Sequence, residues 1–334
     1  MSLEAINARA RGLGTHLLSR NQIEALARAE SIDALATMLQ HDLGSERFDA
    51  DGSVESVEAA LLRWSGDLVE KLGRWLELQP AVASVLFAEE QRRALRRITR
   101  GIIAGQPPAW RLAGLLATPE LPARALEELA HQTTLGGVAG QLMLLRNPFA
   151  DAIAEEARRA STDAFRLDVA LTRTLIDVLR RRARDAGDEA AAYVREIIDS
   201  ENALAAIAIA EHPRDLQPAE LFIPGGQQLD AATFAAAVAE RSLEGALRIL
   251  RTGCTGWLAG AFTDAQVQRS PDAAVLRARL AHHHQLARVA PLSLSPAIAF
   301  LLRLRLQLAD LRRVLWQVAA AAPHGEPTIY SGVS

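Results

Sequence analysis

Apolar residues recur at helical spacing along most of the chain. Between Ser53 and Pro80 they form the stripe of one long amphipathic helix, namely Val54, Val57, Leu61, Leu62, Trp64, Leu68, Leu72 and Trp75. The same periodicity predicts a returning helix over residues 82–103. It also predicts long helices over residues 148–186, 188–211, 264–289 and 296–322. Period-2 alternation is nearly absent, so the pattern predicts an all-α fold.

Shorter helices are expected between these long ones. Ser19 and Gln22 have the spacing of a capping box, which predicts a helix that runs to residue 29. Ser31, Thr134 and Ser242 each precede apolar residues at positions +1, +4 and +8. These apolar residues are Ile32, Leu35 and Leu39, then Leu135, Val138 and Leu142, then Leu243, Ala246 and Leu250. Each of the three polar residues is therefore expected to begin a short helix.

These landmarks repeat along the chain. The interruptions at Pro80, at Gly187 and within residues 291–296 lie about 107 residues apart. A fixed period indicates one supersecondary unit copied along the chain. We therefore expect three similar modules over residues 1–106, 107–212 and 213–334, each with a short helix pair and a long helix hairpin. Together they are expected to form a pseudo-threefold body, either a closed bundle with an axial concavity or an open solenoid with a groove.

Composition narrows the function. Lysine and arginine number 37 and aspartate and glutamate 40, a formal net charge of −3, and no single-sign tail is present. Nucleic-acid binding depends on a concentrated basic surface, so we do not expect a nucleic-acid partner. The N-terminal residues lack a secretory signal pattern, and no apolar stretch is long enough to cross a membrane. A soluble or peripheral cytoplasmic protein is expected.

Catalytic and cofactor signatures are missing from the sequence. No glycine-rich phosphate loop and no magnesium-binding aspartate cluster occurs, so we predict neither catalytic residues nor a cofactor. Adjacent residues of a helix point about 100° apart, so residues 282–284, three consecutive histidines, are not expected to bind a metal. Cys254 is the only cysteine, and its neighbours supply no cation or base. It is expected to be a packing residue.

Polar residues recur on the returning helices. Gln91/Ala94, Asp199/Asn202 and Gln307/Asp310 occupy matching i, i+3 positions, with spacings of 108 residues from Ala94 to Asn202 and from Asn202 to Asp310. Arg195 lies four residues before Asp199, and Glu201 lies beside Asn202. Buried polar groups must be paired, so such a face predicts either a ligand or partner site or a clamp between hairpins. Recurrence in three modules favours the clamp.

Several stretches, in order along the chain, resemble a known family. They are residues 7–11, 17–20 and 30–33, Arg195-Glu-Ile-Ile-Asp-Ser-Glu-Asn202, Leu221-Phe-Ile-Pro-Gly-Gly226, residues 291–302, and Asp310-Leu-Arg312. The resemblance is to the C-type stalk component of the V/A-type rotary ATPases, or V-type ATP synthases, which is the counterpart of the d component of the eukaryotic V-ATPase. The last motif of that family reads Glu-x-x-Asn-Leu-Arg, whereas this chain has Gln307, Asp310 and Arg312. One acid and one amide are kept on the same face.

The resemblance implies a non-catalytic rotor subunit of the central stalk. Family members are funnels of three similar helical domains on the cytoplasmic face of the membrane. The funnel sits on the ring of proteolipid subunits and receives the foot of the central shaft, which couples the shaft to proton or sodium transport. The alternative is a cytoplasmic helical-repeat adaptor protein built as an open solenoid. An enzyme comes third, because it would require a pocket with convergent titratable groups.

Overall fold

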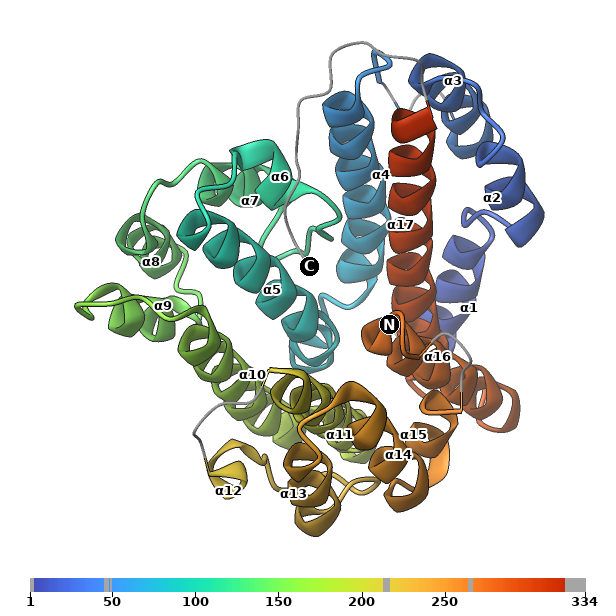
Figure 1. The fold of residues 1–334 in the computed structure, drawn as a ribbon. Coiled ribbons are helices and arrows are strands. Elements are labelled where there is room, and N and C mark those ends of the chain that lie inside the picture. The colour runs from blue at the N-terminus through green and yellow to red at the C-terminus, as the bar shows by residue number, and fades with distance from the viewer. Residues whose placement is uncertain (1–2, 45–47, 49, 213–216, 264–266, 322–334) are drawn as a thin grey trace.

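The computed structural model describes residues 3–44, 48, 50–212, 217–263 and 267–321, and every regular element in them is a helix. The all-α prediction is confirmed. Six helices are long, namely α4 (Val54–Trp75), α5 (Pro80–Ile103), α10 (Ala164–Ala186), α11 (Asp188–Glu211), α16 (Pro271–Val289) and α17 (Ser295–Ala321). They are arranged as three pairs in sequence, each pair joined by one of the three predicted interruptions (Figure 1).

The remaining described helices are shorter. They are α1 (Leu3–Gly14), α2 (Arg20–Leu26), α3 (Ile32–Leu43), α6 (Pro108–Leu112), α7 (Ala123–Ala130), α8 (Leu135–Leu144), α9 (Ala150–Ala157), α12 (Pro218–Leu221), α13 (Ala231–Ala239), α14 (Leu243–Gly253) and α15 (Gly256–Ala261). The predicted capping box of Ser19 and Gln22 is present at α2. Side chains of Ser31, Thr134 and Ser242 accept backbone hydrogen bonds, each 3.1 Å long, at the starts of α3, α8 and α14. The repeated landmark in the sequence is therefore a repeated helix cap.

One helix boundary was predicted wrongly. The single helix expected over residues 148–186 is two helices, because α9 ends at Ala157 and α10 begins at Ala164. Asp163 is the N-cap of α10, and its Oδ1 accepts a hydrogen bond of 2.9 Å from the backbone of Phe165. Glu156 in turn accepts a hydrogen bond of 2.7 Å from the backbone nitrogen of Asp163. Capping by these two carboxylates stabilises the break without a glycine or proline.

Smaller differences concern helix ends and short helices. The helix predicted to reach residue 29 ends at Leu26, and the helix expected to begin at residue 264 is described only from Pro271. Residues 264–266 and residue 322, which the sequence placed in helices, lie outside the described residues. Helices α1, α6, α12 and α15 were not predicted, and α6, α12 and α15 have only four to six residues, too few for a periodicity.

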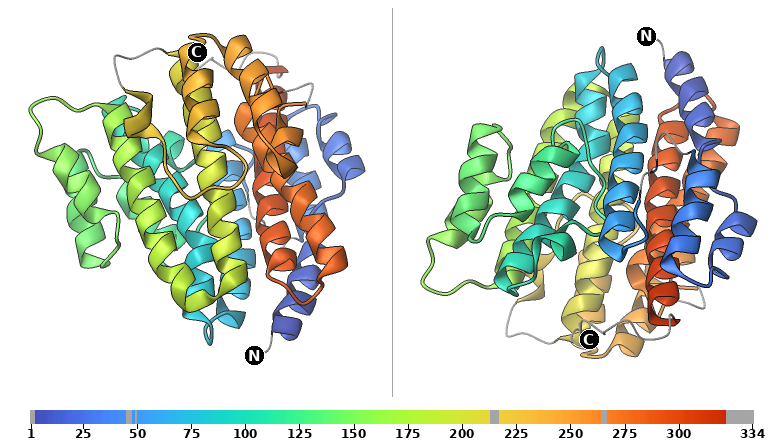
Figure 2. Two further views of the ribbon diagram at one scale, coloured as in Figure 1. Left: turned by 90° about the horizontal axis from the view of Figure 1, so that it is seen from below. Right: turned by 90° about the horizontal axis from the view of Figure 1, so that it is seen from above.

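The long helices are not paired in the same way in every hairpin. Helices α10 and α11 lie against each other, and so do α16 and α17. Helices α4 and α5 instead diverge from their connecting turn (Figure 1), and α5 packs along α10 whereas α4 packs against α17 and α1. The two further views in Figure 2 show the long helices running side by side through the body.

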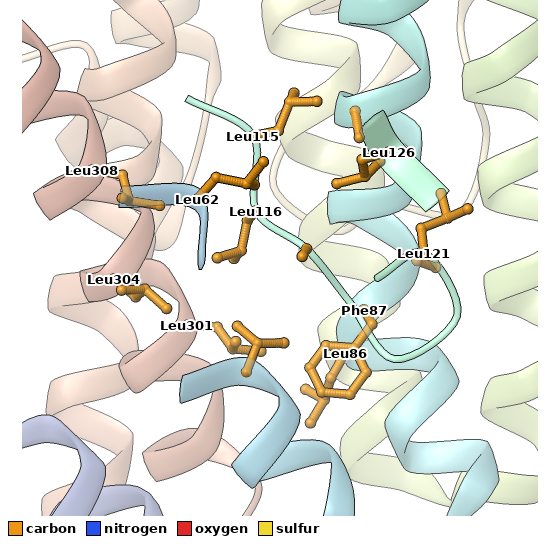
Figure 3. Packing of buried hydrophobic residues seen from close by; sticks show 14 of the residues in the cluster. Leu62, Leu86, Phe87, Leu115, Leu116, Leu121, Leu126, Leu301, Leu304 and Leu308 are labelled. Carbon is orange, nitrogen blue, oxygen red and sulfur yellow. The ribbon is translucent and has the colours of Figure 1, made fainter. Parts of the chain in front are cut away.

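A loop fills the space between the diverging helices. Leu115 and Leu116 follow α6 and are buried, and Figure 3 shows them between Leu62 and Leu308 on one side and Leu126 on the other. Apolar burial of this kind stabilises by about 25 cal/mol per Å² removed from water. The segment after α6, at the beginning of the second predicted module, therefore separates α4 from α5.

Two of the short helix pairs pack on the returning helix of the preceding predicted module, and the first pair packs on the last helix of the described chain. Helices α7 and α8 contact α5, and helices α13 and α14 contact α11. Helices α2 and α3, at the beginning of the chain, contact α17 at its end. Most of the third module's short helices share a core of their own with the second half of α11, which includes Ala206, Phe234 and Phe262. Most of the other buried apolar residues form one cluster that joins the first, second and third predicted modules.

Candidate functional site

Asp199 and Asn202 both bind the segment that leads into α13. Asp199 is 1% exposed, and its carboxylate accepts hydrogen bonds from the backbone nitrogens of Gln227, Gln228 and Leu229, at 2.9, 3.1 and 3.2 Å. Asn202 is fully buried, and its side chain makes two hydrogen bonds with the backbone of Ile223, a donated one of 2.8 Å and an accepted one of 2.9 Å. One face of α11 thus fixes residues 223–229 by five hydrogen bonds.

The glycine pair of this segment allows the close approach. A Cβ atom on Gly226 would lie 2.1 Å from Asp199 Oδ1, so a larger residue there would displace the carboxylate. Gly225 has a φ of +104°, a conformation that favours glycine. The Ile-Pro-Gly-Gly sequence is therefore fitted to the carboxylate that binds it.

The matching residues of the other returning helices lie in the corresponding places. Gln307 Oε1 accepts a hydrogen bond of 2.9 Å from the backbone nitrogen of Leu18, just before α2. Gln91 Nε2 donates to Glu120 Oε2 at 2.9 Å, just before α7, and Gln91 Oε1 accepts from Asn147 Nδ2 at 3.3 Å. Each returning helix therefore binds the residues that precede the next short helix pair. In the first predicted module the contact is with side chains rather than with backbone.

The other predicted polar residues do not act together. Asp310 is half-buried and pairs with Arg313 of its own helix. Arg312 binds Glu58 of α4, with 2.8 Å between Nε and Oε1, and Glu58 also accepts a hydrogen bond of 3.2 Å from the backbone of Gly114. Arg195 is half-buried and lines a groove between α11 and α16. Only Arg312 of these links two long helices.

Glu201 belongs to a buried ion-pair cluster that the sequence did not predict. Its carboxylate accepts a 2.5 Å hydrogen bond from Arg92 of α5. One turn of α5 earlier, Glu89 is 1% exposed and accepts bidentate hydrogen bonds of 3.1 and 3.2 Å from Arg279 of α16. Arg305 of α17 also binds Glu89, at 3.0 Å. This cluster joins α5, α11, α16 and α17, and so brings together all three predicted modules.

The environment keeps these groups charged. Burial raises the pKa of Glu89, but the positive charges of Arg279, Arg305 and Arg93 outweigh burial and hold the pKa well below its usual range. Burial lowers the pKa of Arg279, but the Glu89 carboxylate outweighs it and raises that pKa above its usual value. The Arg279 guanidinium also lies over the ring of Tyr193, 5.3 Å from its centroid. A charged pair this deeply buried is stable only because its partners are fixed.

The consecutive histidines bind a carboxylate. His283 is buried, with Nε2 2.8 Å from Glu196 Oε2 and Nδ1 3.2 Å from Ser295 Oγ. His282 Nε2 lies 3.5 Å from the other oxygen of Glu196. Burial lowers the pKa of His283, so the neutral ring donates to Glu196 and accepts from Ser295. No group of ligands suited to a metal ion occurs among the described residues.

Acid is expected to weaken the contact of Glu196 with the histidines. Burial raises the pKa of Glu196, but hydrogen bonds from His282 and His283 outweigh it and lower the pKa from 4.5 to about 2. The resulting stabilisation is present above pH 4.5 and is lost as the pH falls toward 2. We expect Glu196→Gln to lower the free energy of unfolding by about 3 kcal/mol at pH 7, and by less than half of that at pH 3.

Denaturant unfolding of wild type and Glu196→Gln at both pH values measures this difference. Glu155→Gln is the control, because Glu155 is 59% exposed and pairs with Arg158 and Arg159 on the protein surface. A difference in the free energy of unfolding between wild type and Glu196→Gln that stays constant from pH 7 to pH 3 would contradict the lowered pKa of Glu196.

Cys254 is a packing residue, as predicted. It is 6% exposed, and burial raises the pKa of its thiol to about 12, with Asp199 and Asp230 acting in the same direction. A thiol with such a pKa is not a nucleophile at neutral pH.

Comparison with known proteins identifies the family. None of the described helices has the length and apolar character needed to cross a bilayer. A comparison with curated protein sequences finds no match. The family model described as ATP synthase (C/AC39) subunit matches residues 6–324, nearly the whole chain. This is the family expected from the sequence motifs, and its members are non-catalytic stalk subunits of V/A-type ATPases. The chain therefore belongs to the ATP synthase (C/AC39) subunit family.

Proposed function

We propose that this protein is the central-stalk socket of its rotary ATPase. It receives the foot of the rotating shaft and rests on the proteolipid ring at the cytoplasmic face of the membrane, to which it is bound through protein contacts. Its three modules form a pseudo-threefold funnel, and it couples rotation to proton or sodium transport without catalysing a reaction itself. The family match across residues 6–324 is the observation that carries this proposal.

The packing of the short helix pairs supports the funnel. Helices α7 and α8 pack on α5, α13 and α14 on α11, and α2 and α3 on α17. Asp199 and Gln307 occupy the same position of their helices and bind the backbone just before the following pair. The third contact returns to the beginning of the chain, which is what a cyclic arrangement of three modules requires.

Contacts between the two ends of the described chain argue against an open solenoid. Helix α1 packs against α17, and Asn7 Nδ2 donates hydrogen bonds of 3.1 and 2.8 Å to the backbone oxygens of Pro291 and Ser293. In a linear repeat protein each repeat contacts only its neighbours. The helical-repeat adaptor predicts such a linear arrangement, so these contacts favour the socket.

Polar contacts give the proposed socket the stiffness that torque transmission needs. The Glu89 cluster joins four long helices, and Arg312 joins α17 to α4 through Glu58. Bidentate and charge-assisted hydrogen bonds fix orientation more strictly than apolar packing does. A rigid body between shaft and ring passes rotation on without absorbing it by deformation.

Purification of the tagged chain from detergent-solubilised membranes tests the proposal. The shaft and proteolipid subunits are expected to elute with it in fixed ratio, because the socket contacts both. Untagged cells carried through the same procedure are the control. Recovery of the chain from the soluble fraction, with neither shaft nor proteolipid bound, would support the adaptor instead.

A further inference from the structure

An arginine-lined cleft lies between α5, α10 and α11. Its volume is about 260 Å³, and its lining includes Arg92, Arg93, Arg96 and Arg100 of α5. The lining also includes the apolar side chains of Leu204 and Ile207 of α11. The cleft therefore offers both cationic and apolar groups.

The ion pairs around this cleft leave positive charge uncompensated. Arg92 pairs with Glu201, Arg96 and Arg100 share Asp168, and Arg93, Arg279 and Arg305 share Glu89, while Arg305 also reaches Glu90. The residues that line the cleft include five arginines, with Arg173 the fifth, and four carboxylates, namely Asp168, Glu201, Glu211 and Asp272, an excess of one positive charge. The cleft is suited to an anion.

The buried Arg92 guanidinium at the cleft has donor atoms without hydrogen-bond partners among the described residues. Arg92 is 2% exposed, and its Nε and Nη1 atoms have no partner among the described residues. Arg93 Nε also has no such partner. An unpaired buried donor is costly, and a guanidinium that lacks part of its hydrogen bonds is best satisfied by an oxyanion.

We propose that this cleft receives an acidic side chain, flanked by apolar residues, from a partner protein. A carboxylate on an apolar stem can contact both the arginines and the apolar side chains of Leu204 and Ile207, whereas free inorganic phosphate would leave the apolar side chains without a partner. The partner is the foot of the rotating shaft, an identification that rests on the proposed socket function. Charge complementarity here would fix the orientation of the shaft in the socket.

A charge-removing double variant tests the cleft without leaving a carboxylate unpaired. In Arg93→Gln/Arg100→Gln, Glu89 keeps two arginine partners and Asp168 keeps Arg96. The variant removes two positive charges, which leaves the cleft with more negative than positive charge. Binding of the purified shaft to the full chain is expected to weaken about tenfold or more, and to become less sensitive to salt.

Arg124→Gln/Arg158→Gln is the matched control. Those two side chains are 89% and 68% exposed and lie outside the cleft, so removing the same charge there is expected to leave affinity unchanged. Equal affinity of both double variants for the shaft would overturn the cleft assignment alone. Failure of the wild-type chain to bind the shaft at all would instead overturn the proposed function.

Titration of the chain with inorganic phosphate separates the two sources of an anion. Weak, unsaturable phosphate binding is expected, together with the loss of shaft affinity in Arg93→Gln/Arg100→Gln. Saturable phosphate binding that this variant abolishes, with shaft affinity unchanged, would show a small-anion site and overturn the proposal.

Discussion

Glu89→Gln is expected to lower the free energy of unfolding by about 3–5 kcal/mol, although it changes neither the size nor the shape of the side chain. Glu89 is the carboxylate shared by Arg279, Arg305 and Arg93. Its removal leaves the fully buried Arg279 without a counter-charge, and the cost is that of an uncompensated charge in the interior. Chemical denaturation followed by circular dichroism measures the change.

Glu24→Gln is the control for this substitution. Glu24 is 53% exposed and pairs with Arg20 on the surface of α2, so its loss is expected to change stability by less than about 0.5 kcal/mol. Wild-type stability of Glu89→Gln would contradict the role given to the cluster.

Removing both charges of the central pair is expected to cost less than removing one. In Glu89→Leu/Arg279→Met, Arg305 keeps Glu90 as its partner and no buried arginine is left alone. Replacement of a buried ion pair by apolar residues is often neutral or stabilising. A double variant less stable than Glu89→Gln would show that shape, rather than charge balance, dominates at this junction.

Local pattern predicted most of the helices. Apolar periodicity gave the long helices α4, α5 and α11, and polar residues before short apolar runs gave the caps of α3, α8 and α14. These features depend on residues within one or two turns of each other, which a single sequence displays. The break between α9 and α10 is also local, and Asp163, an N-cap residue type, was its available signal.

The polar faces were partly predictable. Asp199 and Asn202 lie on one face of α11, as their spacing indicated, and both bind residues 223–229. The sequence did not indicate that Gln307 would bind the segment at Leu18, because that partner lies 289 residues away. The contact of Asn202 is not repeated at Asp310, which matches Asn202 in position but pairs with Arg313 of its own helix.

The buried ion pairs were not predicted from the sequence. Glu89 lies one turn after Val85 and Leu86, on the buried face of α5, and that register was the only signal of its burial. Its partner Arg279 is 190 residues distant, and a charged residue on a helix is ordinarily solvated. The divergence of α4 and α5 could not be predicted for the same reason, because Leu115 and Leu116, which lie between them, follow both helices in the sequence.

Removal of this protein from the complex is expected to abolish ion pumping while ATP hydrolysis continues. Other subunits of the complex hydrolyse ATP, so hydrolysis does not require this chain. In the proposed function, rotation of the shaft reaches the proteolipid ring through this chain, so without the chain the shaft would turn without driving the ring. The expected loss is therefore nearly complete for transport and small for hydrolysis.

The ratio of ions transported to ATP hydrolysed, measured in reconstituted vesicles with and without the chain, tests the central claim most directly. We expect this ratio to fall to near zero in the deleted complex and to recover when the purified chain is added back. A deleted complex that pumps ions at the wild-type ratio would contradict the account.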